Sequence, residues 1–176
     1  NKGAIAVSFS GKNLYADNRY NLNWIPIGKE FTITSADKNI LYEIDNTNAI
    51  EIFKRYLGDE ITNNNASALP NFQLLYKEGN TVVSRTPMAI DDNSIVLAAP
   101  IKNNQRFRFG FSNATSVISG SNKISDEIST KPAEAIYIYS CIARKTLLGK
   151  VLENEFRSFE DIAPTSGFFT YGEFYS

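Results

Sequence analysis

Three side chains near the end of the chain have the chemistry to hold a small charged ligand. Cys141 and Arg144 lie one helical turn apart, and Glu173 follows Gly172 close to the C-terminus. A guanidinium binds a carboxylate through two hydrogen bonds, and a carboxylate accepts hydrogen bonds from an ammonium group. Arg144 and Glu173 are therefore a candidate pair for a zwitterion such as an amino acid. The alternative is that they bridge each other.

Cys141 is the only cysteine of the chain, and it is expected in the first turn of a helix. The helix dipole and Arg144 would both favour its thiolate, which suggests a ligand-contacting or redox-responsive thiol. The alternative is a small buried side chain, because cysteine without a disulfide is among the most buried residue types.

The elements that position these residues follow from hydrophobic periodicity. Residues 135–139 predict a buried strand, and residues 142–148 predict a short helix that Gly149 ends. A second helix is expected over 152–162 and a last strand over 168–174. The predicted ligand site is thus a corner where a strand turns into a helix beside a closing strand.

Earlier in the chain, short apolar alternations predict strands separated by turns, with two further helices. The expected strands cover residues 3–11, 31–34, 40–44, 72–76, 81–87, 88–90, 94–98 and 105–111. The expected helices cover residues 49–57 and 113–129, and the expected loops cover residues 13–23 and 62–68. Regular strand–helix–strand alternation is missing from this pattern. The sequence therefore predicts an α+β fold, in which helices pack on the faces of a mixed, largely antiparallel sheet.

Two motifs in this region resemble the C-terminal half of the FIST domain. They are Tyr139-Ser140-Cys141-Ile142-Ala143-Arg144 with Leu147-Leu148-Gly149, and Gly167-Phe168-Phe169-Thr170-Tyr171-Gly172-Glu173. Glycine is common in the family at the position of Ala143, and tyrosine at that of Phe169. Residues 1–45 resemble the end of the FIST N-terminal half, and residues 46–176 the C-terminal domain. The family's domain is longer at both ends, so we expect sequence before Asn1 and after Ser176 to complete it.

The resemblance implies a site and a function. The predicted ligand-binding residues are Tyr139, Ser140, Cys141, Arg144, Thr170, Tyr171, Gly172, Glu173 and Arg85, the last matching an arginine between early strands of the family. FIST domains are cytoplasmic sensory modules of bacteria that bind small molecules, with amino acids proposed. They precede histidine kinase, diguanylate cyclase or chemoreceptor outputs, in two-component or cyclic-di-GMP signalling. The alternative is a protein-interaction or scaffold module, as FIST-C-like segments form in F-box proteins.

Composition argues against several other functions. The chain of 176 residues has no histidine, which removes Ser-His-Asp and Cys-His catalysis and the usual haem ligand. We therefore expect no enzyme activity, no haem or other cofactor, and no metal. The alternative for haem is an axial ligand from the Cys141 thiolate. The net charge is −1, so no nucleic-acid partner is expected. No apolar run approaches the ~20 residues that span a bilayer, so no direct membrane contact is expected. A single cysteine favours a reducing compartment.

Overall fold

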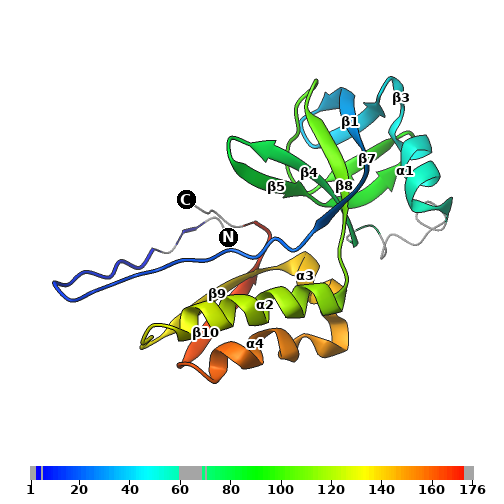
Figure 1. The fold of residues 1–176 in the computed structure, drawn as a ribbon. Coiled ribbons are helices and arrows are strands. Elements are labelled where there is room, and N and C mark those ends of the chain that lie inside the picture. The colour runs from blue at the N-terminus through cyan, green and yellow to red at the C-terminus, as the bar shows by residue number, and fades with distance from the viewer. Residues whose placement is uncertain (1–2, 5, 60–68, 70, 173–176) are drawn as a thin grey trace.

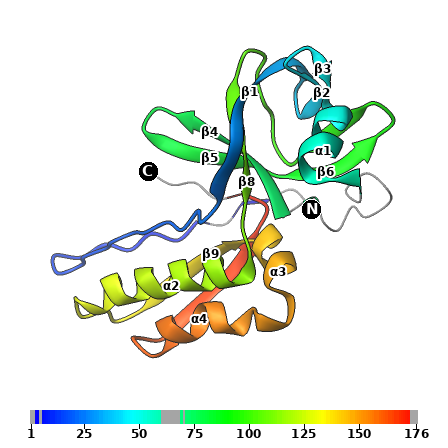
Figure 2. The same cartoon turned by 45° about the vertical axis from the view of Figure 1, so that its right-hand side comes forward.

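The chain forms two parts, an antiparallel sheet and a smaller unit of helices on a parallel strand pair (Figure 1). The computed structural model describes residues 3, 4, 6–59, 69 and 71–172. A second view shows the same division, with the sheet curled around its own core and the helices below it (Figure 2). The predicted α+β class is confirmed. None of the helices in these residue ranges is long and apolar enough to cross a membrane.

The larger part is a curled sheet in which all neighbouring strands are antiparallel. The strands run in the order β5-β4-β8-β1-β2-β7-β6, and β3 pairs with β2. Their bounds are β1 Ile25–Asp37, β2 Ile40–Ile44, β3 Thr47–Asn48, β4 Phe72–Glu78, β5 Thr81–Arg85, β6 Pro87–Asp91, β7 Ser94–Leu97 and β8 Arg106–Phe111. The helix α1 (Ala49–Leu57) packs against this sheet. Asn48 caps it by accepting a hydrogen bond from the Ile50 N–H.

Aromatic rings form the centre of this sheet's core. Phe107 and Phe109 alternate with outward arginines on β8, as the sequence pattern predicts. The Phe109 ring lies 5.3 Å from that of Phe31 and 5.1 Å from that of Phe53, centroid to centroid. Phe31 belongs to β1 and Phe53 to α1. The core is therefore built jointly by residues from both ends of the sheet's sequence.

The smaller unit is a strand–helix–strand crossover with an additional helix. Its elements are α2 (Ala114–Ser129), β9 (Ile136–Cys141), α3 (Ile142–Leu148), the 3-10 turn η3 (Gly149–Val151), α4 (Glu153–Glu160) and β10 (Thr165–Thr170). β9 and β10 are parallel and in continuous register from Thr165 opposite Ile136 to Thr170 opposite Cys141. The helices α2 and α4 lie side by side (Figure 1), and Ser125 Oγ donates a 2.8 Å hydrogen bond to the Ser158 carbonyl between them.

Successive side chains of these two strands point to opposite faces of the small sheet. On β10, Phe169 packs against Phe156 of α4, with 6.2 Å between ring centroids, which identifies the face covered by helices. Phe168, its neighbour, contacts Tyr139 on the other face, with 5.2 Å between centroids. The helices thus cover one face, and the aromatic rings of β9 lie on the other.

Three local predictions need correction. Residues 3–11, predicted as a strand, are coil wherever the structure describes them, because no described strand pairs with them. The strand predicted over 135–139 exists, but it is not buried, since Tyr137 and Tyr139 are more than half exposed. The last strand begins at Thr165, ahead of the predicted Phe168, and the described strand ends at Thr170. The loop predicted over 62–68 lies outside the described residues.

Candidate functional site

The parallel register brings three of the predicted ligand residues to one edge of the small sheet. Cys141 is directly opposite Thr170, and Tyr139 is directly opposite Phe168. Residues opposite each other in a parallel pair lie on the same face, and residues two apart in a strand share it too. Tyr139, Cys141 and Thr170 therefore line the open face at the carboxyl ends of both strands, where β9 continues directly into α3.

Arg144 lies on the other side of this corner and is held by a carboxylate from α4. Its Nη2 atom is 2.8 Å from Oε1 of Glu155, and the two side chains are only 13% and 5% exposed. Its Nη1 atom donates a 2.8 Å hydrogen bond to the Asn21 carbonyl oxygen. Arg144 thus connects α3 to α4 and to a segment more than a hundred residues earlier in the chain.

A small polar cluster surrounds this ion pair. Ser121 Oγ, on α2, donates a 3.2 Å hydrogen bond to Glu155 Oε1. A further hydrogen bond of 3.1 Å joins the Asn21 amide to the Ser121 hydroxyl. The second carboxylate oxygen, Glu155 Oε2, is buried and has no hydrogen-bond partner within the described part of the chain. The cluster is therefore charged, desolvated and incompletely satisfied, which is costly in a protein interior.

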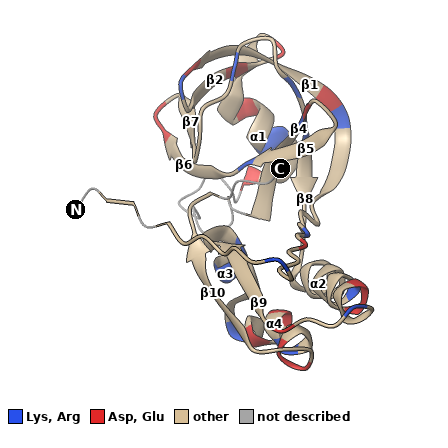
Figure 3. Cartoon of the chain, turned by 90° about the vertical axis from the view of Figure 1, so that its left-hand side faces the viewer, with Lys and Arg blue, Asp and Glu red and all other residues tan. Residues whose placement is uncertain are grey.

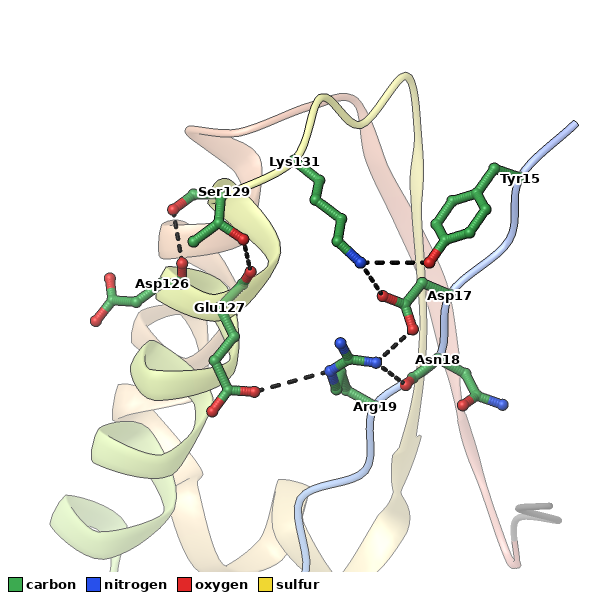
Figure 4. A network of polar contacts seen from close by, with 9 residues as sticks. Tyr15, Asp17, Asn18, Arg19, Asp126, Glu127, Ser129 and Lys131 are labelled. Atoms are coloured by element: carbon green, nitrogen blue, oxygen red, sulfur yellow. Dashed lines mark hydrogen bonds and ion pairs between the residues drawn. The ribbon is translucent and has the colours of Figure 1, made fainter. Parts of the chain in front are cut away.

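Asn21 belongs to residues 15–23, called here the strap, which run along α2 before entering β1. Lys131 Nζ lies 3.3 Å from the Tyr15 hydroxyl and 3.6 Å from Asp17 Oδ2 (Figure 4). Arg19 pairs with Asp17 and lies 3.7 Å from Glu127 on α2. These exposed ion pairs individually contribute little stability, but together they fix the strap's path along the helix.

The strap also packs against α2 at Gly120. Asn23 Nδ2 donates a 3.1 Å hydrogen bond to the Ser116 carbonyl, and the Asn23 carbonyl accepts a 2.8 Å hydrogen bond from Ser112 Oγ. A Cβ atom at Gly120 would lie 1.5 Å from Asn23 Nδ2. A larger residue at position 120 would therefore displace the Asn23 amide, the end of a flexible side chain, from this place on α2.

Burial sets the protonation behaviour of Glu155. It raises the pKa of this carboxyl above its ordinary value of 4.5, although the charge of Arg144 and the hydrogen bond from Ser121 both lower that pKa. Desolvation of the charged form outweighs its pairing here because one oxygen has no described donor. The carboxylate is held in the cluster at a cost in free energy.

Replacing Glu155 by glutamine tests this balance, because glutamine does not titrate. A raised folded-state pKa means that the folded protein binds more protons than the unfolded chain between the two pKa values. The stability of the natural protein relative to Glu155→Gln should therefore fall as pH rises through that window, and then stay constant. Urea unfolding of both proteins from about pH 4 to about pH 8 measures this. If the relative stability instead rises with pH, the charge of Arg144 lowers the pKa of Glu155 by more than burial raises it.

The structure separates the remaining predicted ligand residues. Ser140 is buried on the helix side of β9, and its Oγ meets no hydrogen-bond partner among the described residues. Arg85 lies in the curled sheet, donating 3.0 Å hydrogen bonds to the Pro100 and Ser84 carbonyls. Tyr171 is 87% exposed just past β10, and Gly172 is exposed as well. Glu173 lies outside the described residues, so its pairing with Arg144 stays a prediction.

Two shallow hollows occur on α2. One, of about 530 Å³, lies on the helix itself around Ile118 and Asn122. The other, of about 320 Å³, lies between the strap and α2 and is lined by Asn21, Asn23 and Gly120 among others. Neither is lined by Cys141. In the described part of the chain, no cluster of three or more acidic or cysteine side chains could bind a metal ion.

Sequence reasoning missed Glu155 as the partner of Arg144. It placed this glutamate near the start of a helix, where the dipole favours anions. The stronger signal was its position, since residues 152, 155 and 159 recur on one helical face and Phe159 is buried. A carboxylate on an apolar face needs a buried cation. No comparable pattern in the local sequence predicts that the strap contacts α2 and Arg144.

The fold and its buried cluster define an α+β domain in which a strand–helix corner is tied to an N-terminal segment. Residues 49–176 match the FIST C domain and residues 1–47 match the FIST N domain, so the chain belongs to the FIST family. FIST domains are sensory domains of signal transduction, usually linked to signalling output domains. No curated protein and no solved structure matches the chain significantly. The boundary between the two matches falls inside the curled sheet, between β3 and α1.

Proposed function

We propose that this chain is the ligand-binding sensory domain of a bacterial signal-transduction protein, with amino acids or similar small zwitterions and anions as candidate ligands. The observation that carries the proposal is the shared edge of Tyr139, Cys141 and Thr170 at the carboxyl ends of two parallel strands. Ligands in sheets with parallel strands bind at that end, where side chains from several strands converge.

Recognition at this corner would combine hydroxyl groups with the buried guanidinium. Tyr139 and Thr170 offer hydroxyls on the open face, while Arg144 lies one turn into α3. A ligand carboxylate would compete with Glu155 for Arg144, and the raised pKa of Glu155 makes its release by protonation easier. The predicted second contact, from Glu173 to a ligand ammonium group, completes the proposed zwitterion site.

The same contacts supply a route from ligand to output. Arg144 also holds the Asn21 carbonyl, so a shift of its guanidinium would loosen the strap from α2. A ligand that binds one strap position better than the other shifts the population between them. We propose that an attached or partner output domain of the histidine kinase, diguanylate cyclase or chemoreceptor type, in the cytoplasm, responds to this shift.

Cys141 gives the test, because it is the only cysteine of the chain and lies at the proposed site. An amino-acid and small-anion library is screened by thermal shift, and each compound that raises the melting temperature is tested for slowing alkylation of Cys141. We expect at least one compound both to raise the melting temperature and to slow the alkylation of Cys141. Thr170→Val should weaken the binding of that compound, whereas Thr146→Val, on the exposed side of α3, should leave its affinity unchanged. Stabilising compounds that leave the alkylation rate unaltered would place the ligand elsewhere.

A protein-interaction module is the second candidate function, and one observation favours it. Tyr137, Tyr139 and Phe168 form an exposed aromatic patch on the open face of the small sheet. Exposed apolar patches of this kind mark interaction surfaces. Two results together would favour this function over ligand sensing. No compound in the library would stabilise the protein, and substitution of the aromatic patch would abolish its association with another protein.

A further inference from the structure

The open face of the small sheet carries no charge along its whole length. It is formed by every second residue of β9 and β10, which the parallel register sets opposite one another in three pairs. The six residues are Tyr137, Tyr139, Cys141, Ser166, Phe168 and Thr170. Neither strand contains a charged residue, whereas Lys, Arg, Asp and Glu occur on the helices of this unit (Figure 3). A group that covers the face therefore meets no ionic partner among these six residues.

This face has an aromatic end and a polar end. Tyr137, Tyr139 and Phe168 are 57%, 59% and 53% exposed. Tyr139 lies 5.2 Å from each of the other two rings, centroid to centroid, so the three form one continuous aromatic patch. Cys141 and Thr170 follow at the carboxyl ends of the strands and are partly buried. The face thus leads from an open aromatic patch to a more enclosed polar corner.

The size of the aromatic patch favours a small molecule over a folded partner. Aromatic side chains have about 150–250 Å² of surface each, so three that are just over half exposed offer about 250–400 Å². A stable protein interface buries about 800 Å² on each partner. One aromatic side group has a surface of the order that the patch can cover.

The spacing between the patch and the corner limits the length of the ligand. Tyr139 and Phe168 precede Cys141 and Thr170 by two residues each, which is roughly 6.6 Å along the strands. An amino acid with a ring on its side chain spans such a distance from its carboxylate to the far side of the ring. Alanine and serine have no group that reaches the patch from the corner.

The arrangement of the three rings favours another ring as the group that covers them. The ring planes of Tyr139 and Phe168 meet at 88°, and those of Tyr137 and Phe168 at 76°. This is the edge-to-face contact that aromatic rings prefer, and it stabilises a pair beyond the burial of apolar area alone. A further ring can extend the cluster in the same way. An ammonium group would lose its hydration here without a carboxylate on the face to pair with.

We propose that the ligand is an amino acid or related zwitterion with an aromatic side group. Its ring lies on Tyr137, Tyr139 and Phe168, and its charged groups lie at the corner beside Cys141 and Thr170. Tyr137 and Phe168 are then residues that determine specificity, because they contact the side group and not the charged groups. This inference rests on the proposed function, since it names the class of ligand for the same site.

Isothermal titration calorimetry of the full chain with L-phenylalanine, L-leucine and L-alanine tests the proposal. The dissociation constant of L-phenylalanine should be at least about 10-fold lower than that of L-leucine, because only the ring gains the edge-to-face contacts. L-alanine should bind most weakly. L-phenylalanine should also slow the alkylation of Cys141, which places it at the corner.

Leucine substitutions show whether the aromatic patch causes this preference. Tyr137→Leu and Phe168→Leu each keep an apolar side chain but remove a ring, so both should lower the ratio of the L-leucine to the L-phenylalanine dissociation constant towards one. The matched control is Tyr42→Leu, which removes an exposed tyrosine from β2 of the curled sheet and should leave the ratio unchanged. If the patch variants fail to fold by circular dichroism, saturation-transfer NMR of L-phenylalanine with the natural protein replaces them. The ring protons should then receive more saturation than the α-proton.

The outcomes distinguish this proposal from the one on which it rests. If L-leucine binds as tightly as L-phenylalanine and both protect Cys141, the site binds ligands but the aromatic preference is wrong. If no compound of the amino-acid and small-anion library slows alkylation, the ligand site itself is wrong, and this inference fails with it. If the patch variants keep the full preference, or the α-proton receives the larger saturation, the ring is bound elsewhere and the patch is left to a protein partner.

Discussion

Replacing Arg144 by alanine is expected to lower the free energy of unfolding by about 3–5 kcal/mol, the usual result of removing one partner from a buried ion pair. Glu155, 5% exposed, would be left as an isolated buried carboxylate, and the Asn21 carbonyl would lose its donor. The loss should shrink at acid pH, where Glu155 can take up a proton. Urea unfolding followed by circular dichroism measures both effects.

Two further variants make the Arg144 result interpretable. Arg157→Ala removes an exposed arginine from α4 and should change stability by no more than about 0.5 kcal/mol. The double variant Arg144→Met with Glu155→Leu removes both charges and fills the space with apolar groups, so it should recover most of the lost stability. Equal losses in the single and double variants would show that packing of the long side chains matters here, and not their charge.

Replacing Gly167 by alanine is expected to separate β9 from β10. A Cβ atom at Gly167 would lie 1.9 Å from the Ile138 carbonyl oxygen, and both belong to the backbone of the paired strands. Side chains can rotate away from such a contact, but a hydrogen-bonded strand pair cannot. We expect a loss of about 3 kcal/mol, at the upper end of overpacking effects. Hydrogen exchange at the amides of β9 should rise sharply while that of the curled sheet changes little.

Gly172 provides the matched control for this substitution. It lies just beyond β10, and a Cβ atom there would meet no atom within 4 Å. Gly172→Ala should therefore leave both unfolding and hydrogen exchange unchanged. If Gly167→Ala behaves in the same way, the close approach of the two strands does not constrain residue 167, and the glycine has some other role.

Local patterns predicted most elements of this fold because those elements carry their own signals. The alternation of Phe107 and Phe109 with arginines, for example, specifies a half-buried strand without reference to any other residue. Two motifs around Cys141 and Gly172 were sufficient to predict the family. What they could not predict was burial, because whether Tyr137 is covered depends on what lies opposite it.

The candidate site was harder to predict than the fold for a related reason. Cys141 and Thr170 were expected together, and the parallel register places them opposite each other. Arg144 was expected to face a ligand or Glu173, yet its described partners come from α4 and the strap. Long-range partners such as Asn21 depend on the path of the whole chain, which no local spacing encodes. The strand predicted for residues 3–11 failed similarly, since a strand pattern supplies no neighbour to pair with.

The boundary between the two family matches, near residue 48, has an evolutionary consequence. β1, on the N-terminal side, bonds to β8 from the C-terminal side, and it contributes Phe31 and Ile33 to the common interior. A gene rearrangement that separated the halves near residue 48 would remove Phe31, Ile33, Leu41 and Ile44 from this core and separate them from the residues they pack against. Neither half would then keep the whole core, so we expect the two halves to be inherited together.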